Sequence, residues 1–273
     1  MNKYLQLFRT GNAIMGIVGV IVAAFMAAGT DIISHWSDLI LSVVIVFTFI
    51  AGGNSLNDYI DADIDRTAHP DRPIPSGRMT RKQARDIGLF MLALSVMASM
   101  FTFDTSCTVI VLIAVALIIS YEMFLKQRGF IGNVTVAVMT GMLFLLGGAV
   151  VGDVQGNIVV ALMAMIVSIG REISKDIEDK EGDDGDRFTL PMRIGDRNAA
   201  TIASLCYIAG PVLSILPIIW DTYSALYYAV LLADTAFIYC AFIVFRDPSK
   251  AQRMAKKAMV LGLAAFILGV IPV

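Results

Sequence analysis

Two sets of three aspartates with identical spacing are the part of this sequence best suited to chemistry. The sets are Asp58, Asp61 and Asp65, and Asp176, Asp179 and Asp183. In each set the second residue follows the first by three positions and the third follows the second by four, so on a helix all three lie on one face. Like charges on one helical face repel each other, and a stripe that occurs twice therefore favours bound cations.

Mg²⁺ is the cation that suits these clusters best. It prefers oxygen ligands and usually binds one or two carboxylates while it retains water and substrate phosphate oxygens. Two such clusters at the mouth of a helix bundle would together clamp a diphosphate. Basic residues interleave with the acids, which a phosphate site requires and a metal store does not. These basic residues are Arg66, Arg72, Lys126, Arg171 and Lys175. The alternative is that the acidic loops are merely solvated surface.

The rest of the chain is too apolar for a soluble protein. Of its 273 residues, 57% are hydrophobic and 16% are charged, whereas soluble domains have roughly 45–50% and about 25%. This composition excludes a soluble enzyme, a disordered chain and a disulfide scaffold. The net charge of −2 provides no basic field for nucleic acid, so no nucleic-acid partner is expected. We therefore predict an integral membrane protein.

Nine segments are candidates for membrane helices, each of which needs about 20 largely apolar residues. The predicted segments are 12–31, 38–57, 86–104, 107–125, 133–152, 156–174, 199–219, 223–245 and 255–273. The segments are continuously apolar instead of alternating, which indicates helices and not a β-barrel. The predicted fold class is an all-α membrane bundle of nine transmembrane helices, with residues 1–273 forming a single domain.

The distribution of basic residues predicts how this bundle is oriented. All 21 Lys and Arg residues lie before the first segment, in every second connection after it, or within the few segment residues that border such a connection. By the positive-inside rule, the N-terminus and these connections are cytoplasmic, and the C-terminus lies outside. The two long connections, 58–85 and 172–198, carry both aspartate sets and are then cytoplasmic. We expect a multi-pass protein of the cell membrane whose site faces the cytoplasm.

This placement favours chemistry on a diphosphate that carries a lipid tail. The diphosphate would bind at the membrane surface, and the tail would lie among the apolar helices. Bound Mg²⁺ favours cleavage of an allylic C–O bond, because it neutralises the charge that develops on the leaving diphosphate. A nucleophile from a second substrate would capture the prenyl cation. The sequence therefore predicts a membrane prenyltransferase.

The two acidic motifs also resemble those of a known family. Residues 57–65 (NDYIDADID) resemble the NDxxDxxxD motif of the UbiA prenyltransferase superfamily, and residues 179–183, preceded by Asp176, resemble its second, DxxxD-type motif. Within the superfamily, residues 71–77 (DRPIPSG) and 171–183 (REISKDIEDKEGD) are most similar to the archaeal enzymes of ether-lipid synthesis. The resemblance covers essentially the whole chain.

The resemblance implies transfer of a geranylgeranyl group from geranylgeranyl diphosphate to geranylgeranylglyceryl phosphate, with two Mg²⁺ ions bound. The implied partners are an isoprenoid diphosphate donor, a lipid phosphate acceptor and the bilayer. The implied metal ligands are Asn57, Asp61, Asp65, Asp179 and Asp183, with Asp58 and Asp176 as direct or indirect partners, and Asp61, Asp65, Asp179 and Asp183 are the implied catalytic residues. The expected substrate phosphate-binding residues are Asn54, Arg66, Arg72, Tyr121, Lys126, Arg171 and Lys175.

Three other functions remain open from the sequence. A UbiA-type aromatic prenyltransferase of quinone biosynthesis would share the chemistry and differ in the acceptor. A cation transporter with acidic cytoplasmic gates would place ionisable residues near the membrane midplane, whereas here the acids lie at one face. A phosphatidyltransferase of the CDP-alcohol type also uses spaced aspartates, but its Asp-Gly-x-x-Ala-Arg opening is absent around either set. Asn54 stays open between a substrate contact and a helix–helix hydrogen bond.

Overall fold

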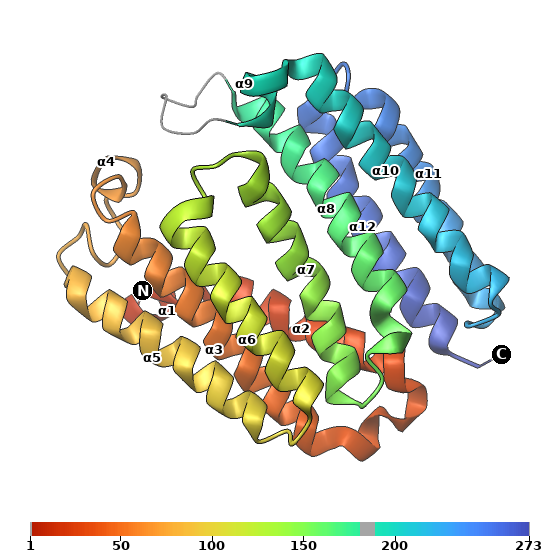
Figure 1. The fold of residues 1–273 in the computed structure, drawn as a ribbon, viewed down its shortest axis with the longest axis horizontal. Helices are drawn as coiled ribbons and strands as arrows, with labels where there is room; N and C mark the ends of the chain where they lie inside the picture. Colours follow the sequence, from red (N-terminus) through yellow and green to blue (C-terminus); the bar gives the residue numbers. More distant parts are fainter. Residues whose placement is uncertain (1, 181–188, 273) are drawn as a thin grey trace. The chain divides into compact units, whose positions relative to one another are not determined.

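A computed structural model describes residues 2–180 and 189–272 of the chain. The predicted all-α class is confirmed, since every regular element in these two ranges is helical (Figure 1). Nine helices of 14 or more residues occur in the described part, and each overlaps one predicted segment. They are α2 (Thr10–Ala28), α3 (Trp36–Ile60), α5 (Arg81–Met100), α6 (Thr105–Ser120), α7 (Phe130–Val150), α8 (Ile158–Asp179), α10 (Asp196–Ile219), α11 (Val230–Ile243) and α12 (Pro248–Val270).

Short elements connect these helices. They are the helices α1 (Lys3–Leu7), α4 (Asp65–Ala68) and α9 (Leu190–Ile194), the 3₁₀ turns η1 (Gly29–His35), η3 (Gln155–Asn157) and η4 (Ala225–Ala229), and the π-helical turn η2 (Tyr121–Leu125). Thr80 caps α5 through a reciprocal pair of hydrogen bonds with Gln83, a capping box of the Thr-x-x-Gln type. The sequence therefore marks the start of this helix locally.

Six stretches of the described residues are long and apolar enough to cross a membrane. The first, 51 residues long, joins α2, η1 and α3 into one stretch. Helices α5 and α12 are not among the six, and both carry several charged residues in their first turns. The structure thus supports a multi-pass membrane protein, whereas nine crossings stay a prediction.

The chain divides into two compact units, and the first contains residues up to 124 together with 146–154. Its central contact is that of α3 with α5. Gly52 of α3 and Gly88 of α5 let the two backbones approach closely, since a Cβ on Gly52 would lie 3.0 Å from the carbonyl oxygen of Gly88. Small residues at a helix crossing allow such packing in membranes. The crossing fixes the end of α3, which carries the first aspartate set.

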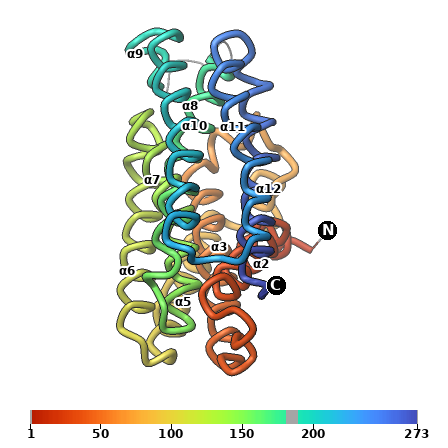
Figure 2. Tube along the Cα trace, turned by 90° about the vertical axis from the view of Figure 1, so that its right-hand side faces the viewer, coloured from red at the N-terminus to blue at the C-terminus, as the bar shows by residue number. Residues whose placement is uncertain are grey.

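The second unit contains residues 125–145 and 155 onward. Here α8 packs against α10 and α12, and α11 packs against α10 and α12 (Figure 2). Tyr207 of α10 is fully buried in their common core, and its hydroxyl lies 2.9 Å from Ser174 Oγ on α8. Gly170 of α8 allows this approach, because a Cβ there would lie 3.1 Å from the carbonyl oxygen of Ala203. These contacts hold the end of α8, which carries the second set.

Candidate active site

The first aspartate set forms the stripe that its spacing predicts. Helix α3 ends at Ile60, but Asp61 N still donates to Asn57 O (2.9 Å) and Asp65 N donates to Asp61 O (2.8 Å), so the helical path continues into α4. Asp58 and Asp65 are buried, each 3% exposed, and Asp61 is half-buried. Three carboxylates therefore lie in succession along one face of a single helical path.

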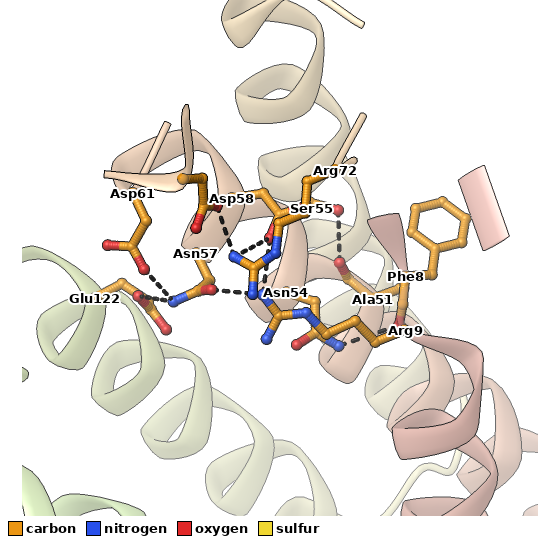
Figure 3. A network of polar contacts seen from close by, with 11 residues as sticks. Phe8, Arg9, Ala51, Asn54, Ser55, Asn57, Asp58, Asp61, Arg72 and Glu122 are labelled. Carbon is orange, nitrogen blue, oxygen red and sulfur yellow. Dashed lines mark hydrogen bonds and ion pairs between the residues drawn. The ribbon is translucent and has the colours of Figure 1, made fainter. Parts of the chain in front are cut away.

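Two arginines balance the charge of this stripe (Figure 3). Arg72 Nη1 donates to Asp65 Oδ2 (2.6 Å) and lies 3.6 Å from Asp58 Oδ1. Arg9 Nη2 donates to the same oxygen of Asp58 (2.8 Å). A buried carboxylate requires a charged partner, and Asp58 has two. Asp58 consequently anchors the arginines and is less accessible to a metal ion than Asp61.

The Asn57 amide connects the stripe to two residues that the sequence analysis did not select. Its Oδ1 accepts a hydrogen bond from Arg9 (2.7 Å), and its Nδ2 donates to Asp61 Oδ2 (3.1 Å) and to Glu122 Oε2 (3.0 Å). Glu122 is buried in the π-helical turn η2. The signal for Glu122 was an acid at the end of an apolar run, because such residues are costly in membranes and usually have a role. Arg9 gave no comparable signal beyond its position before the first apolar segment.

The remaining predicted residues of the first unit lie around this centre. Arg66 is exposed and pairs at 3.8 Å with Asp63, which is also exposed. Asn54 Nδ2 donates to the Phe8 carbonyl oxygen (3.1 Å), so in this structure it contacts the N-terminal segment. Tyr121 begins the π-helical turn and is half-buried. Turns of this kind occur frequently at functional sites.

The second aspartate set is described only in part. Asp176 and Asp179 lie three residues apart at the end of α8, and Asp183 lies outside the described residues. Asp176 Oδ2 accepts a hydrogen bond from Asn133 Nδ2 of α7 (2.6 Å), and Asp179 is exposed. Asp176 is thus held by a neighbouring helix in the same unit, as Asp58 is held by arginines in the other.

Helix α8 also carries two of the predicted phosphate-binding residues, Arg171 and Lys175, and a hydroxyl group near them. Ser168 and Arg171 lie three positions apart and so share a face, and Lys175 follows one turn later. Arg171 donates to Glu172 through Nη2, but its buried Nε and the buried Ser168 Oγ have no hydrogen-bond partner among residues 2–180 and 189–272. Unsatisfied buried donors are rare in folded proteins. Lys126, which precedes α7, is half-buried.

The donor set fits Mg²⁺ better than a softer metal. Within residues 2–180 and 189–272, no group of three His, Cys, Asp or Glu side chains forms a preassembled metal site. The side chains at Asp61, Asp65 and Asp179 all offer oxygen, the ligand atom that Mg²⁺ prefers. Because Mg²⁺ typically takes one or two protein carboxylates and completes its shell with phosphate and water, pairs of carboxylates suffice.

The sequence matches the family model described as the UbiA prenyltransferase family over residues 17–270. It is 34% identical over 276 residues to the digeranylgeranylglyceryl phosphate synthase of Methanosphaera stadtmanae, and the match covers 98% of this chain and 99% of that protein.

Two solved structures extend the comparison. One, reported under "Structural and mechanistic insights into the biosynthesis of Digeranylgeranylglyceryl phosphate synthase in membranes", is 30% identical with a TM-score of 0.90, and 98% of each chain is covered. The other is a UbiA homologue from Archaeoglobus fulgidus bound to DMAPP and Mg²⁺. It is 14% identical with a TM-score of 0.67, over 97% of this chain and 99% of that one, and shows the common fold.

Proposed function

The chain belongs to the UbiA prenyltransferase family, and we propose that it transfers a geranylgeranyl group from geranylgeranyl diphosphate to geranylgeranylglyceryl phosphate. It is a prenyltransferase, and full-length similarity to digeranylgeranylglyceryl phosphate synthases supports this pair of substrates over an aromatic acceptor. The same similarity argues against a transporter or a phosphatidyltransferase. The product would carry the second ether bond of an archaeal lipid.

The observation that carries the proposal is the aspartate stripe at the end of α3 with Arg72 against it. Asp61 supplies oxygens for a metal ion, Asp65 lies one turn further, and Arg72 supplies a guanidinium beside them. Carboxylates with an adjacent guanidinium suit a metal-bound diphosphate, because the arginine fork matches phosphate oxygens.

The residues that would hold two Mg²⁺ ions come from both aspartate sets. They are Asp61, Asp65, Asp179 and Asp183, with Asp58 and Asp176 as supporting residues. Asn57, which the resemblance implies as a ligand, would instead support Asp61, because its amide oxygen accepts from Arg9 and its amide nitrogen faces Asp61. When bound, Mg²⁺ supplies positive charge that stabilises the departing diphosphate. Asp58 would keep Arg9 and Arg72 in place, and Asn133 would keep Asp176 in place.

Basic and polar side chains would bind the phosphate groups. The donor diphosphate would be bound by Arg72 and Lys126, with Tyr121, Asn54 and Arg66 near it. The acceptor phosphate would be bound by Arg171 and Lys175, since Arg171 Nε and Ser168 Oγ are buried donors that lack a partner within the described part of the chain. Because the acceptor carries a phosphate of its own in addition to the donor's diphosphate, two phosphate sites would account for basic residues near both aspartate sets.

The chemistry requires the allylic C–O bond of the donor to break and a new C–O bond to the acceptor glycerol oxygen to form. The diphosphate leaves with the bonding electrons, and the glycerol hydroxyl releases its proton. Arg72 and Lys126 would hold the diphosphate oxygens as negative charge develops on them. Apolar side chains of the helices would exclude water, which would otherwise capture the prenyl cation.

The site would face the cytoplasm of a cell membrane that the chain crosses nine times, with the N-terminus inside and the C-terminus outside. Residues 1–273 would act as a single catalytic domain. The segregation of all 21 basic residues supports this orientation. Single cysteines placed near Arg78 and Arg193 should react with an impermeant thiol reagent from the cytoplasmic side only, and labelling from opposite sides would contradict the topology.

A transfer assay in membranes tests the function. Labelled geranylgeranyl diphosphate is offered with geranylgeranylglyceryl phosphate and, in parallel, with 4-hydroxybenzoate, in the presence of Mg²⁺. We expect a labelled lipid phosphate from the first acceptor, and its loss in Asp61→Ala and Asp179→Ala. A prenylated benzoate would instead keep the mechanism and overturn the acceptor.

A further inference from the structure

The Asn57 side chain lies between one cation and two carboxylates, and this arrangement determines its orientation. Arg9 can only donate hydrogen bonds, so the atom of Asn57 that faces it at 2.7 Å must be the amide oxygen. The other end of the amide, its nitrogen, then faces the carboxylate oxygens of Asp61 and Glu122 and donates to both. The two ends of the Asn57 amide have nearly the same shape, and here the hydrogen-bond partners decide which end is the oxygen.

We propose that Arg9 is a positioning residue of the reaction, which acts through Asn57 on the carboxylate of Asp61. By accepting from Arg9, the amide is held with both N–H groups directed at Asp61 and Glu122 (Figure 3). Asp61 is thereby kept in the direction from which it would bind Mg²⁺. This inference rests on the proposed function, in which Asp61 is a metal ligand.

Arg9 is itself fixed by the backbone and by its second partner. It has a left-handed conformation (φ 46°, ψ 60°), which residues other than glycine rarely adopt, between α1 and α2. The same Nη2 donates to Asp58 Oδ1 (2.8 Å), and Asp58 is 3% exposed. Strained backbone that persists in a structure must be held by its surroundings. The backbone conformation and the ion pair with buried Asp58 thus both restrict where the Arg9 guanidinium can lie.

Hydrogen bonds also fix the residues that precede Arg9 in the chain. Gln6 Nε2 donates to the Asp71 carbonyl oxygen (3.0 Å), and Asn54 Nδ2 donates to the Phe8 carbonyl oxygen (3.1 Å). These bonds tie α1 to the loop that contains Arg72 and to α3. Residues 2–9 carry none of the expected site residues, but these bonds fix them beside the first aspartate set.

Glu122 completes the arrangement as the second acceptor for the amide. It is 7% exposed and lies in the π-helical turn η2, a kind of turn that occurs frequently at functional sites. Without the Glu122 carboxylate, the Asn57 amide nitrogen would donate to Asp61 alone, and the amide would be held less firmly against rotation. Glu122 is therefore a second positioning residue, on the opposite side of Asn57 from Arg9.

The test measures metal binding directly and does not depend on turnover. Mn²⁺ binding to the purified, detergent-solubilised protein is titrated by electron paramagnetic resonance for the wild type, Arg9→Gln, Arg9→Lys and the control Lys3→Gln. Lys3 lies in the same segment, is exposed, and contacts the Arg78 carbonyl oxygen (3.3 Å) and the Tyr4 ring, not the aspartate set. We expect Arg9→Gln to bind Mn²⁺ about 10–100-fold more weakly, the usual effect of removing a residue that orients a ligand. Arg9→Lys should fall in between, and Lys3→Gln should equal the wild type.

A double-mutant cycle with Asn57→Ala separates positioning from a general effect on folding. If Arg9 acts through Asn57, replacing Arg9 should weaken Mn²⁺ binding much less when Asn57 is already alanine. Wild-type affinity in Arg9→Gln, or independent additive losses in the cycle, would overturn the proposal. If Arg9→Gln does not fold, the cycle is run with Arg9→Lys under the same criterion. Absence of Mn²⁺ binding to the wild type would instead count against the metal site of the proposed function.

Discussion

Arg72 Nη1 lies 2.6 Å from Asp65 Oδ2, seven residues earlier in the chain, and both side chains are largely shielded from solvent. This ion pair closes the loop after α4 back onto the aspartate stripe. Since Asp58 lies 3.6 Å from the same guanidinium, one arginine serves two buried carboxylates. The arrangement makes Arg72 important for stability as well as for phosphate binding.

Replacing Arg72 with glutamine should therefore lower the free energy of unfolding. Removal of one partner from a buried ion pair leaves an uncompensated charge and costs up to about 3 kcal/mol at a partly shielded site. Arg72→Lys should cost less, because it retains the charge without the guanidinium fork. Thermal unfolding in detergent measures both. Equal stability of Arg72→Gln and the wild type would show that the pair contributes nothing.

Asp61 and Asp63 provide a matched comparison within one loop. Asp61→Asn should lower kcat by more than about 100-fold. Loss of a residue that only orients a metal ligand costs up to about 100-fold, and Asp61 is proposed as a ligand itself. Asp63→Asn should leave kcat unchanged, because Asp63 is exposed and pairs with Arg81 at 3.1 Å. The transfer assay measures both variants. A similar loss in the two would mean that the overall negative charge of the loop matters and not the stripe.

Removal of divalent cations should abolish transfer without unfolding the protein. Arg9 and Arg72 already balance Asp58 and Asp65, so the fold does not rely on a metal ion for charge neutrality. Activity should be lost in EDTA and return with Mg²⁺, and Ca²⁺ should restore it poorly, because Ca²⁺ requires more ligands at longer distances. Unfolding midpoints with and without EDTA provide the control, and a large fall in EDTA would contradict this account.

Tyr207 offers a test of how the second unit holds the end of α8. Tyr207→Phe removes the hydroxyl that lies 2.9 Å from Ser174 Oγ and should cost about 1 kcal/mol of unfolding free energy. Tyr207→Ala also removes a fully buried ring and should cost about 3–5 kcal/mol. Denaturation in detergent measures the difference. If Phe were as damaging as Ala, the hydrogen bond and not the ring would fix the helix.

Local spacing explains what the sequence could predict of the site. Asp58, Asp61 and Asp65 lie on one helical path because their separations match the helix, which requires no knowledge of the rest of the fold. Arg72 was selected only as a basic residue among the acids, and its pairing with Asp65 was not predicted, because α4 ends at Ala68 and helical spacing does not reach Arg72. The positions of the nine long helices followed from apolar segments of suitable length.

Contacts between residues distant in the chain could not be predicted in this way. Arg9 meets Asn57 across 48 residues, and Glu122 meets Asn57 across 65. These contacts depend on the close crossing of α3 with its neighbours and on a π-helical turn, and neither leaves a distinct periodic pattern in the sequence. The residue types alone gave no reason to bring the three side chains together.

The contacts of the N-terminal segment also have a consequence for biosynthesis. The partners of Arg9, which are Asn57 and Asp58, are synthesised 48 and 49 residues after it. Gln6 likewise precedes its partner Arg78 by 72 residues. Until α3 has left the ribosome, the guanidinium has no carboxylate to neutralise it and remains a bare positive charge in front of the first apolar helix. The side chain can therefore take up its place beside Asn57 only after the chain has been synthesised as far as the end of α3.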